Sequence, residues 1–243
     1  MSPLTDTPIP PVGSRTERRT ARTAAAILAA AERLFLGQGF AATTMDELSE
    51  QADVAIGSIY AHFGSKDGIY AALIDRALEL DKRYSEEGFG TGDSPLEHLI
   101  GLAEGYLRFA REHPGYFRLF RFPPADLPAA GDDAGRPTAR VAARIGEETT
   151  RMAGLLREAI AEGVVRALDP ESTAAFLWAA WDGVIAAHLG PANMNLTDAE
   201  FEAVLDRARE TIGLGLLDTA ATRPSRASHP TFAERSTTKG SQR

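Results

Sequence analysis

The chain has 243 residues, 44% of them hydrophobic, with a formal net charge of −8 and no cysteine, so disulfide bonds and thiolate metal sites are excluded. Its five histidines show no metal-ligand spacing such as His-x3-His, and no window approaches the roughly 18 apolar residues that a membrane span needs. We therefore expect a cytoplasmic protein of one large or two small domains, with no metal, no cofactor and no membrane partner.

The charge is distributed unevenly along the chain. Residues 14–22 carry a net charge of +3 and residues 220–243 carry +4, so the remainder carries −15. Basic segments on an acidic body are typical of a protein that touches phosphate groups locally. Both segments can also be solvated tails, and we expect disorder in residues 1–18 and 219–243.

Most of the chain carries the apolar period of an α-helix, and the alternating pattern of strands is hard to find. An amphipathic helix is expected at residues 19–37. Thr44 then begins a second helix as its N-cap, with Glu47 as its capping-box partner. A short third helix is expected near residues 55–62, and Gly64 ends it.

Longer helices are expected in the rest of the chain. Ser65 caps a fourth helix that extends to about residue 86, where the segment GFGTGDSP interrupts the pattern. Five further helices are expected at residues 96–111, 114–120, 138–165, 170–189 and 196–217. The fourth helix would therefore join a small N-terminal module to a larger helical one.

The segment 43–70 has the layout of a helix-turn-helix, in which a support helix and a short turn hold a second helix free to enter the major groove. Gly57 allows a close approach of the backbone to DNA. Ser58, Tyr60 and His62 can point outward with hydrogen-bonding groups. Thr44 and Lys66 stand at helix starts, where they can meet phosphates. Each residue alone is more often an ordinary half-buried surface residue of a small bundle, and only their joint spacing favours DNA binding.

The sequence TTMDELSEQADVAIGSIYAHFGSKDGIYAAL resembles the N-terminal domain of the TetR family of transcriptional repressors. The similarity covers about residues 20–75, and the positions in register are Phe35, Gly39, Phe40, Thr43, Thr44, Ala52, Val54, Gly57, Tyr60, Phe63, Lys66 and Leu73. It implies an all-α homodimer with a three-helix DNA-binding domain at 19–66. It also implies a larger helical domain for effector binding and dimerisation at 67–218.

The resemblance also implies a set of DNA contacts. By position, the phosphate contacts are Thr44, Tyr60, His62 and Lys66, and the base-facing residues are Ala55, Ile56, Gly57 and Ser58. Thr43 and Arg22 complete the predicted site. The family often has Ser and Lys at positions 55 and 56, so this third helix lacks a side-chain N-cap and a cation. Ile56 can contact a thymine methyl group, and the arginine segment 15–22 can reach the backbone or the minor groove.

The segments 106–120 and 176–189 resemble one subgroup of TetR C-terminal domains. Their aromatic residues are first of all candidates for the core. The alternative is that several line an apolar cavity with a few polar groups to orient an effector. The candidate effector residues are Tyr106, Phe109, His113, Phe117, Phe120, Met152, Trp178, Trp181 and Asp182.

The last two helices are candidates for a dimer interface. Small residues recur every four positions at Ala175, Ala179, Gly183 and Ala187, and an apolar stripe follows at Phe201, Leu205, Ala208, Ile212 and Leu216. Two such helices from each subunit would form a four-helix interface about a two-fold axis. The alternative is that the stripe packs within the chain.

These features predict a ligand-responsive repressor that binds double-stranded operator DNA as a homodimer and is released by a small apolar or amphipathic effector. A helical adaptor that binds another protein is an alternative. An all-helical enzyme is a further alternative, although the sequence carries neither a GxSxG motif nor a phosphate-binding glycine loop, and no catalytic residue is predicted.

Overall fold

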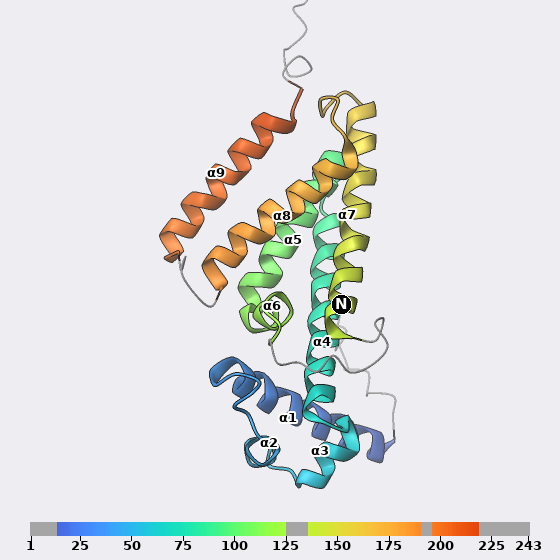
Figure 1. The fold of residues 1–243 in the computed structure, drawn as a ribbon. Helices are drawn as coiled ribbons and strands as arrows, with labels where there is room; N and C mark the ends of the chain where they lie inside the picture. The colour runs from blue at the N-terminus through green and yellow to red at the C-terminus, as the bar shows by residue number, and fades with distance from the viewer. Residues whose placement is uncertain (1–13, 125–135, 191–195, 219–243) are drawn as a thin grey trace, which may run out of the picture.

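A computed structural model describes residues 14–124, 136–190 and 196–218 of the chain. These residues form nine α-helices and no β-strand, which confirms the predicted all-α fold with a small N-terminal and a larger C-terminal module (Figure 1). The helices are α1 (Arg15–Gly37), α2 (Met45–Ala52), α3 (Ile56–Phe63), α4 (Lys66–Phe89), α5 (Pro95–Glu112), α6 (Pro114–Arg121), α7 (Pro137–Ala161), α8 (Pro170–Leu189) and α9 (Asp198–Leu216).

The first helix begins earlier than the sequence predicted. The hydroxyl of Ser14 accepts a hydrogen bond from the backbone N–H of Glu17, and the Glu17 carboxylate accepts one from the Ser14 N–H. This capping box starts α1 at Arg15, so the expected disorder is wrong for residues 14–18. The parts of that prediction at 1–13 and 219–243 lie outside the described residues.

The short-range signals around the second and third helices are confirmed. Thr44 and Glu47 form the predicted capping box, and Gly64 ends α3 with a φ of 72°, a backbone conformation that glycine adopts without strain. The Ser65 hydroxyl accepts a hydrogen bond from the Gly68 N–H at the start of α4. Each of these devices acts within a few residues, which explains why the sequence alone reveals them.

The N-terminal module packs around a cluster of aromatic rings. The Phe40 ring lies 5.1 Å from that of Phe35 and 5.6 Å from that of Tyr70, between centroids. Tyr70 belongs to α4, and its hydroxyl donates a 2.6 Å hydrogen bond to the carbonyl of Leu119 in α6. The base of α4 therefore connects the small module to the larger one through shared core residues (Figure 1).

Helices α4 and α5 cross at very short range. Gly88 of α4 faces Gly101 of α5, and a Cβ atom added at Gly101 would lie 2.1 Å from the Gly88 carbonyl oxygen. Gly105 is similarly close to the carbonyl of Tyr84. These glycines allow backbone contact between the helices, which sets the position of α5 on α4.

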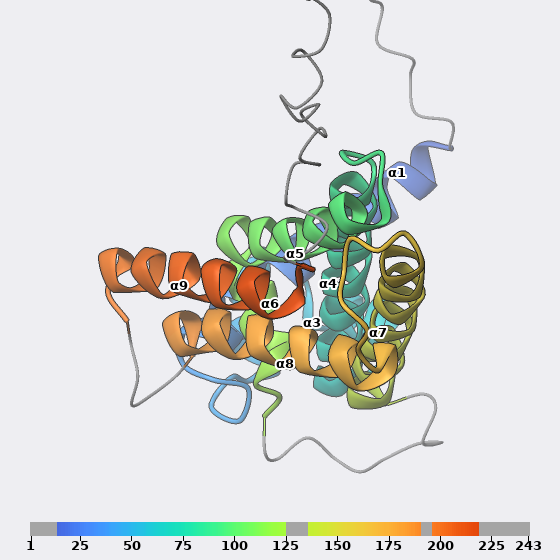
Figure 2. The same ribbon diagram turned by 90° about the horizontal axis from the view of Figure 1, so that it is seen from above.

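Helices α5, α8 and α9 run side by side and obliquely to α4 and α7 (Figures 1 and 2). Phe201, Leu205 and Leu216 of the α9 stripe are at most 8% exposed, because they pack within the chain. These three residues therefore follow the intramolecular alternative, and the pairing of subunits through α9 stays a prediction. No helix among the described residues is long and apolar enough to cross a membrane.

Candidate DNA-binding face and effector cavity

Helix α3 presents one side to solvent. Ile56 is 37% exposed and Tyr60 is 50% exposed, although both are large apolar or aromatic side chains. Ala55 and Gly57 are exposed beside them, while Ile59 is fully buried against the module core. Large apolar side chains left in solvent on one helix face are typical of a contact surface.

The turn before α3 fixes the direction of this helix. Asp53 adopts the left-handed conformation with a φ of 52°, and the Ser49 hydroxyl donates a 2.6 Å hydrogen bond to the Val54 carbonyl. Ala55 is the N-cap of α3 and makes no side-chain capping bond, as its methyl side chain requires. No capping side chain therefore occupies the N–H groups of the first turn of α3, which suits a close approach to an anion.

Thr44 and Arg22 are exposed, as a DNA contact requires, and Ser58 is half-buried. The Thr44 hydroxyl also accepts the capping bond from the Glu47 N–H. Arg22 extends from α1, inside the capped helix rather than on a disordered arm. The DNA contacts of all three residues remain predictions.

Lys66 and Thr43 make hydrogen bonds within the protein. The Lys66 ammonium donates hydrogen bonds to the carbonyls of Phe40 at 2.8 Å and Thr43 at 2.9 Å, and it lies 4.4 Å from the centre of the Phe40 ring. Thr43 is 1% exposed, and its hydroxyl donates to the carbonyl of Gly39. Both residues hold the loop between α1 and α2, because their donors are bound to its carbonyls. Their contacts with DNA stay predictions.

His62 is also turned inward. Its Nδ1 donates a 2.7 Å hydrogen bond to the carbonyl of Ser58, one helical turn earlier. Its Nε2 is buried and has no hydrogen-bond partner among the described residues. Neither ring nitrogen faces outward in this conformation, and the phosphate contact of His62 stays a prediction.

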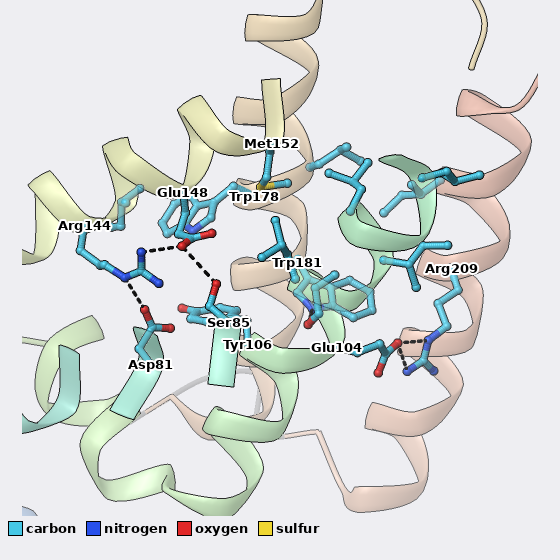
Figure 3. Close-up of a pocket in the computed structure, with 18 of the residues that line it drawn as sticks. Asp81, Ser85, Glu104, Tyr106, Arg144, Glu148, Met152, Trp178, Trp181 and Arg209 are labelled. Atoms are coloured by element: carbon cyan, nitrogen blue, oxygen red, sulfur yellow. Dashed lines mark hydrogen bonds and ion pairs between the residues drawn. The ribbon is translucent and has the colours of Figure 1, made fainter. Parts of the chain in front are cut away.

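The larger module contains a partly open cavity of about 360 Å³ among α4 to α9 (Figure 3). Its wall is almost entirely apolar, as is usual for small-molecule sites of this size. Five of the predicted effector residues line it, namely Tyr106, Phe120, Met152, Trp178 and Trp181. The structure therefore brings these side chains from four helices into one space.

The other four predicted effector residues lie outside the cavity wall. Phe109 and Phe117 are fully buried in the core, where their rings pack against Tyr106 and Phe120 of the wall. His113 ends α5, and its Nε2 lies 3.2 Å from the Tyr84 hydroxyl. Asp182 is 2% exposed and already bound by two donors. The cavity lining does not include these four residues, and their contact with an effector stays a prediction.

Asp182 helps to position a residue that does line the cavity. Its carboxylate accepts hydrogen bonds from the Tyr106 hydroxyl at 2.9 Å and from Arg121 at 2.6 Å. Burial, and then the nearby Asp182 carboxylate, raise the pKa of Tyr106 well above its ordinary value, so this hydroxyl stays protonated. The Trp181 indole N–H donates to the Ala103 carbonyl at 2.8 Å, which fixes a second side chain of the wall.

One end of the cavity carries charged groups that the sequence did not reveal. The Arg144 guanidinium lies between Asp81, at 2.9 Å, and Glu148, at 2.5 Å (Figure 3). The Ser85 hydroxyl donates to Glu148 at 3.1 Å. Burial raises the pKa of Asp81 to about 6, against the opposing effect of the guanidinium. In the sequence these residues resemble ordinary surface residues of two helices, because Asp81 and Arg144 stand 63 positions apart and nothing in the sequence marks their contact.

Family models match both modules of the chain. The model described as "Bacterial regulatory proteins, tetR family" matches residues 27–73, which include the helix-turn-helix. The model described as "Tetracyclin repressor-like, C-terminal domain" matches residues 99–211. The chain belongs to the TetR family. This TetR-family protein is a DNA-binding transcriptional regulator, and its curated relatives are regulators rather than enzymes.

Curated relatives resemble this TetR-family protein over part of their length. The HTH-type transcriptional regulator TtgR of Pseudomonas putida is 43% identical over 65 residues, which are 27% of this chain and 31% of the relative. The similarity thus spans about a third of that relative, and the relative's activity as a whole does not transfer to this chain on that ground alone.

Solved structures share the fold over nearly their whole length. The structure of the ketosteroid transcriptional regulator KstR2 of Mycobacterium tuberculosis superimposes with a TM-score of 0.62 at 19% identity, covering 86% of this chain and 97% of that one. The structure of AibR in complex with isovaleryl coenzyme A and operator DNA superimposes with a TM-score of 0.59 at 19% identity, covering 79% and 97%. At these identities the likeness concerns the fold alone.

Proposed function

We propose that this regulator is a ligand-responsive repressor. It binds a palindromic operator as a homodimer and leaves the DNA when a small apolar or amphipathic effector occupies the cavity. The observation that carries this proposal is the course of α4. Its base packs against α1 and α3, and its middle contributes Leu78, Asp81 and Ser85 to the cavity wall.

The DNA contact is proposed to centre on the exposed side of α3. Tyr60 would contact the phosphate backbone, and Ile56, with Ala55, Gly57 and Ser58, would face the bases or their sugar edges. Thr44 and Arg22 would add contacts from α2 and α1. Few of these side chains can read a base by hydrogen bonds, so specificity would depend partly on the shape of the DNA.

The dimer is proposed to form through the outer faces of α8 and α9, which lie at one edge of the molecule (Figure 2). Phe176 is 62% exposed and Leu214 is 72% exposed, and both are large apolar side chains. The small residues Ala175, Ala179 and Gly183 are exposed on α8 beside Phe176, where they would permit a close approach of a second copy. A two-fold axis there would repeat α3 at the spacing of successive major grooves, about 34–36 Å.

The effector is proposed to act through α4. A ligand in the cavity contacts the middle of α4, so a ligand that prefers a different position of this helix would shift the dimer away from its DNA-binding conformation. The solved complex of AibR with isovaleryl coenzyme A and operator DNA pairs a small ligand with DNA on this same fold, which supports such a pairing of sites.

The proposal is tested with purified protein and DNA from upstream of its own gene in a mobility-shift assay. We expect sequence-selective, salt-sensitive binding to a palindrome, and about tenfold weaker binding by Tyr60→Ala. Tyr60→Phe keeps the ring and removes only the hydroxyl, so its comparison with Tyr60→Ala separates the contribution of the hydroxyl from that of the ring. Circular dichroism confirms that each variant is folded. Failure to bind any palindrome selectively would contradict the proposal.

The dimer is tested separately by sedimentation. The double variant Phe176→Asp, Leu214→Asp should sediment as a monomer, because charged side chains at the centre of an apolar interface oppose association. The double variant Gly146→Ala, Glu147→Gln, on the exposed side of α7, is the control and should leave the dimer intact. A monomeric unsubstituted protein would contradict this part of the proposal.

A further inference from the structure

We propose that ligands enter and leave the cavity between α5 and α9, through an opening that is gated by the ion pair between Glu104 and Arg209. This inference rests on the proposed effector function of the cavity and adds the route by which a ligand reaches it. It depends on three observations, namely the exposed residues of the wall, the ion pair that spans them, and a second ion pair that joins the same helices away from the cavity.

The exposed residues of the cavity wall mark the opening. Among the described residues that line the cavity, only Ile100 and Arg209 are exposed, and Ile100 is 53% exposed. Ile100 belongs to α5 and Arg209 to α9, two helices that run side by side (Figure 2). A side chain that both lines the cavity and meets solvent stands at its rim. The partly open cavity therefore reaches solvent between these two helices.

The ion pair between Glu104 and Arg209 spans this opening. Glu104 lies one turn after Ile100 on α5, and its Oε1 accepts hydrogen bonds from Nε of Arg209 at 3.1 Å and from Nη2 at 2.9 Å (Figure 3). Both side chains line the cavity. Arg209 also binds Asp206 at 3.1 Å, and its guanidinium lies 5.7 Å from the centre of the Trp181 ring. The guanidinium thus lies between the rim and an aromatic ring of the wall.

The exposure of this pair suits a gate. The side chains of Glu104 and Arg209 are 45% and 39% exposed, whereas those of Asp81 and Arg144 at the other end of the cavity are nearly buried. An exposed ion pair contributes little free energy and is weakened by salt, so it can open and close again without unfolding the wall. When it opens, an apolar ligand can pass Ile100 and the aliphatic part of the arginine side chain.

A second ion pair provides a matched comparison. Arg111 of α5 binds Glu202 of α9, and these side chains are 43% and 55% exposed. The two pairs therefore join the same helices and have similar exposure, but neither Arg111 nor Glu202 lines the cavity. If a pair acts as a gate because of its position over the opening, only the Glu104–Arg209 pair should affect ligand entry.

The first experiment measures binding rates of an uncharged apolar probe, N-phenyl-1-naphthylamine, by stopped flow on the full-length protein. The chain contains two tryptophans, Trp178 and Trp181, and both line the cavity, so energy transfer from tryptophan to the probe reports binding there. We expect Glu104→Gln to raise the association and dissociation rates by about fivefold each, with the dissociation constant changed less than about twofold. Glu202→Gln is the control and should leave both rates unchanged.

The unsubstituted protein gives a second readout that depends on no variant. Raising the NaCl concentration from about 0.05 M to about 0.5 M should accelerate both rates, because salt screens an exposed ion pair and the probe itself carries no charge. The rates of Glu104→Gln should respond to salt much less, since its gate is already open. Equal salt dependence in the two proteins would contradict the gate.

The place of the opening is tested by blocking it. The chain has no cysteine, so Ile100→Cys can be labelled at one position with a bulky maleimide. We expect the labelled variant to bind the probe at least about tenfold more slowly, because the label stands at the rim. Val164→Cys with the same label is the control, since Val164 is an exposed apolar residue outside the cavity wall, and its rates should not change.

Two results would overturn the inference in distinguishable ways. If the probe binds, but its rates change neither in Glu104→Gln nor in labelled Ile100→Cys, ligands enter elsewhere and the effector function of the cavity stands. If the unsubstituted protein shows no energy transfer to the probe, both the inference and the proposed effector site fail.

Discussion

The DNA-binding module and the effector domain use polar side chains in different ways. In the module, many polar contacts join near neighbours in the chain, as in the Thr44–Glu47 capping box and the Ser49–Val54 bond. In the effector domain they join distant residues, since Asp81 and Arg144 are 63 positions apart in the chain and Tyr106 and Asp182 are 76 apart. The module is thus assembled largely from local signals, whereas the cavity exists only when helices α4 to α9 pack together.

The DNA-binding module and the effector domain also differ in whether their large apolar side chains face solvent or the interior. The module leaves Ile56 and Tyr60 in solvent on a short helix, where a flat partner can reach them. The effector domain turns most of its aromatic residues inward, toward its core and a partly open cavity. The contrast teaches that one region is suited to touch a surface and the other to surround a small molecule, and that α4 links the two.

The strongest test of the long-range character of the effector domain is Gly101→Ala. The added Cβ would lie 2.1 Å from the Gly88 carbonyl oxygen, so α4 and α5 must move apart. We expect the free energy of unfolding to fall by about 3 kcal/mol, measured by urea denaturation. Gly146→Ala, where no atom lies within 4 Å of the added Cβ, is the control and should not destabilise the protein. Equal stability of the two variants would show that the crossing is not tightly packed.

The next largest effect is expected at Lys66 in the DNA-binding module. Lys66→Met removes the donor to the carbonyls of Phe40 and Thr43, and we expect a loss of about 2 kcal/mol in the free energy of unfolding. DNA binding should weaken as well, because the loop before α2 is no longer held by the hydrogen bonds from Lys66. If Lys66→Met weakens DNA binding without lowering stability, Lys66 is a direct phosphate contact as the sequence predicted.

The stability of the cavity wall should depend on pH through Asp81. Its pKa is raised from 3.8 to about 6 in the folded protein, so the stability that it contributes is fully present below about pH 4 and is lost as the pH rises through 6. Relative to Asp81→Asn, the unsubstituted protein should lose about 1–2 kcal/mol between pH 4 and 7 in urea denaturation. A difference between the two proteins that does not vary with pH would contradict the raised pKa.

The smallest expected effect concerns Arg22 on the exposed side of α1. If its guanidinium contacts one phosphate, Arg22→Ala should lower the slope of log affinity against log salt concentration by about one, with equal weakening at all DNA sequences. Arg157→Ala in α7, far along the chain from the DNA-binding module, is the control. An unchanged salt dependence in Arg22→Ala would remove α1 from the proposed DNA contact.

Much of the fold could be predicted from sequence because helix boundaries depend on local chemistry. Ser65 and Gly64 mark a helix start and a helix end through contacts within a few residues. The start of α1 was missed, although Ser14 and Glu17 have capping-box spacing, because the surrounding arginines resemble a solvated tail. About half of the predicted effector set lines the cavity for a related reason: apolar periodicity shows that an aromatic side chain is buried, but not whether it faces the core or a cavity.

The sequence by itself determined the order of the helices, the helix-turn-helix and the bare, apolar character of the exposed side of α3. Tertiary structure decided that Lys66 binds carbonyls, that the α9 stripe packs within the chain, and that Asp81, Arg144 and Glu148 meet at one end of a cavity. The reason is physical. A cap or a turn is stabilised by neighbours in the chain, whereas the partner of a buried charge or an apolar stripe is chosen by the packing of distant helices.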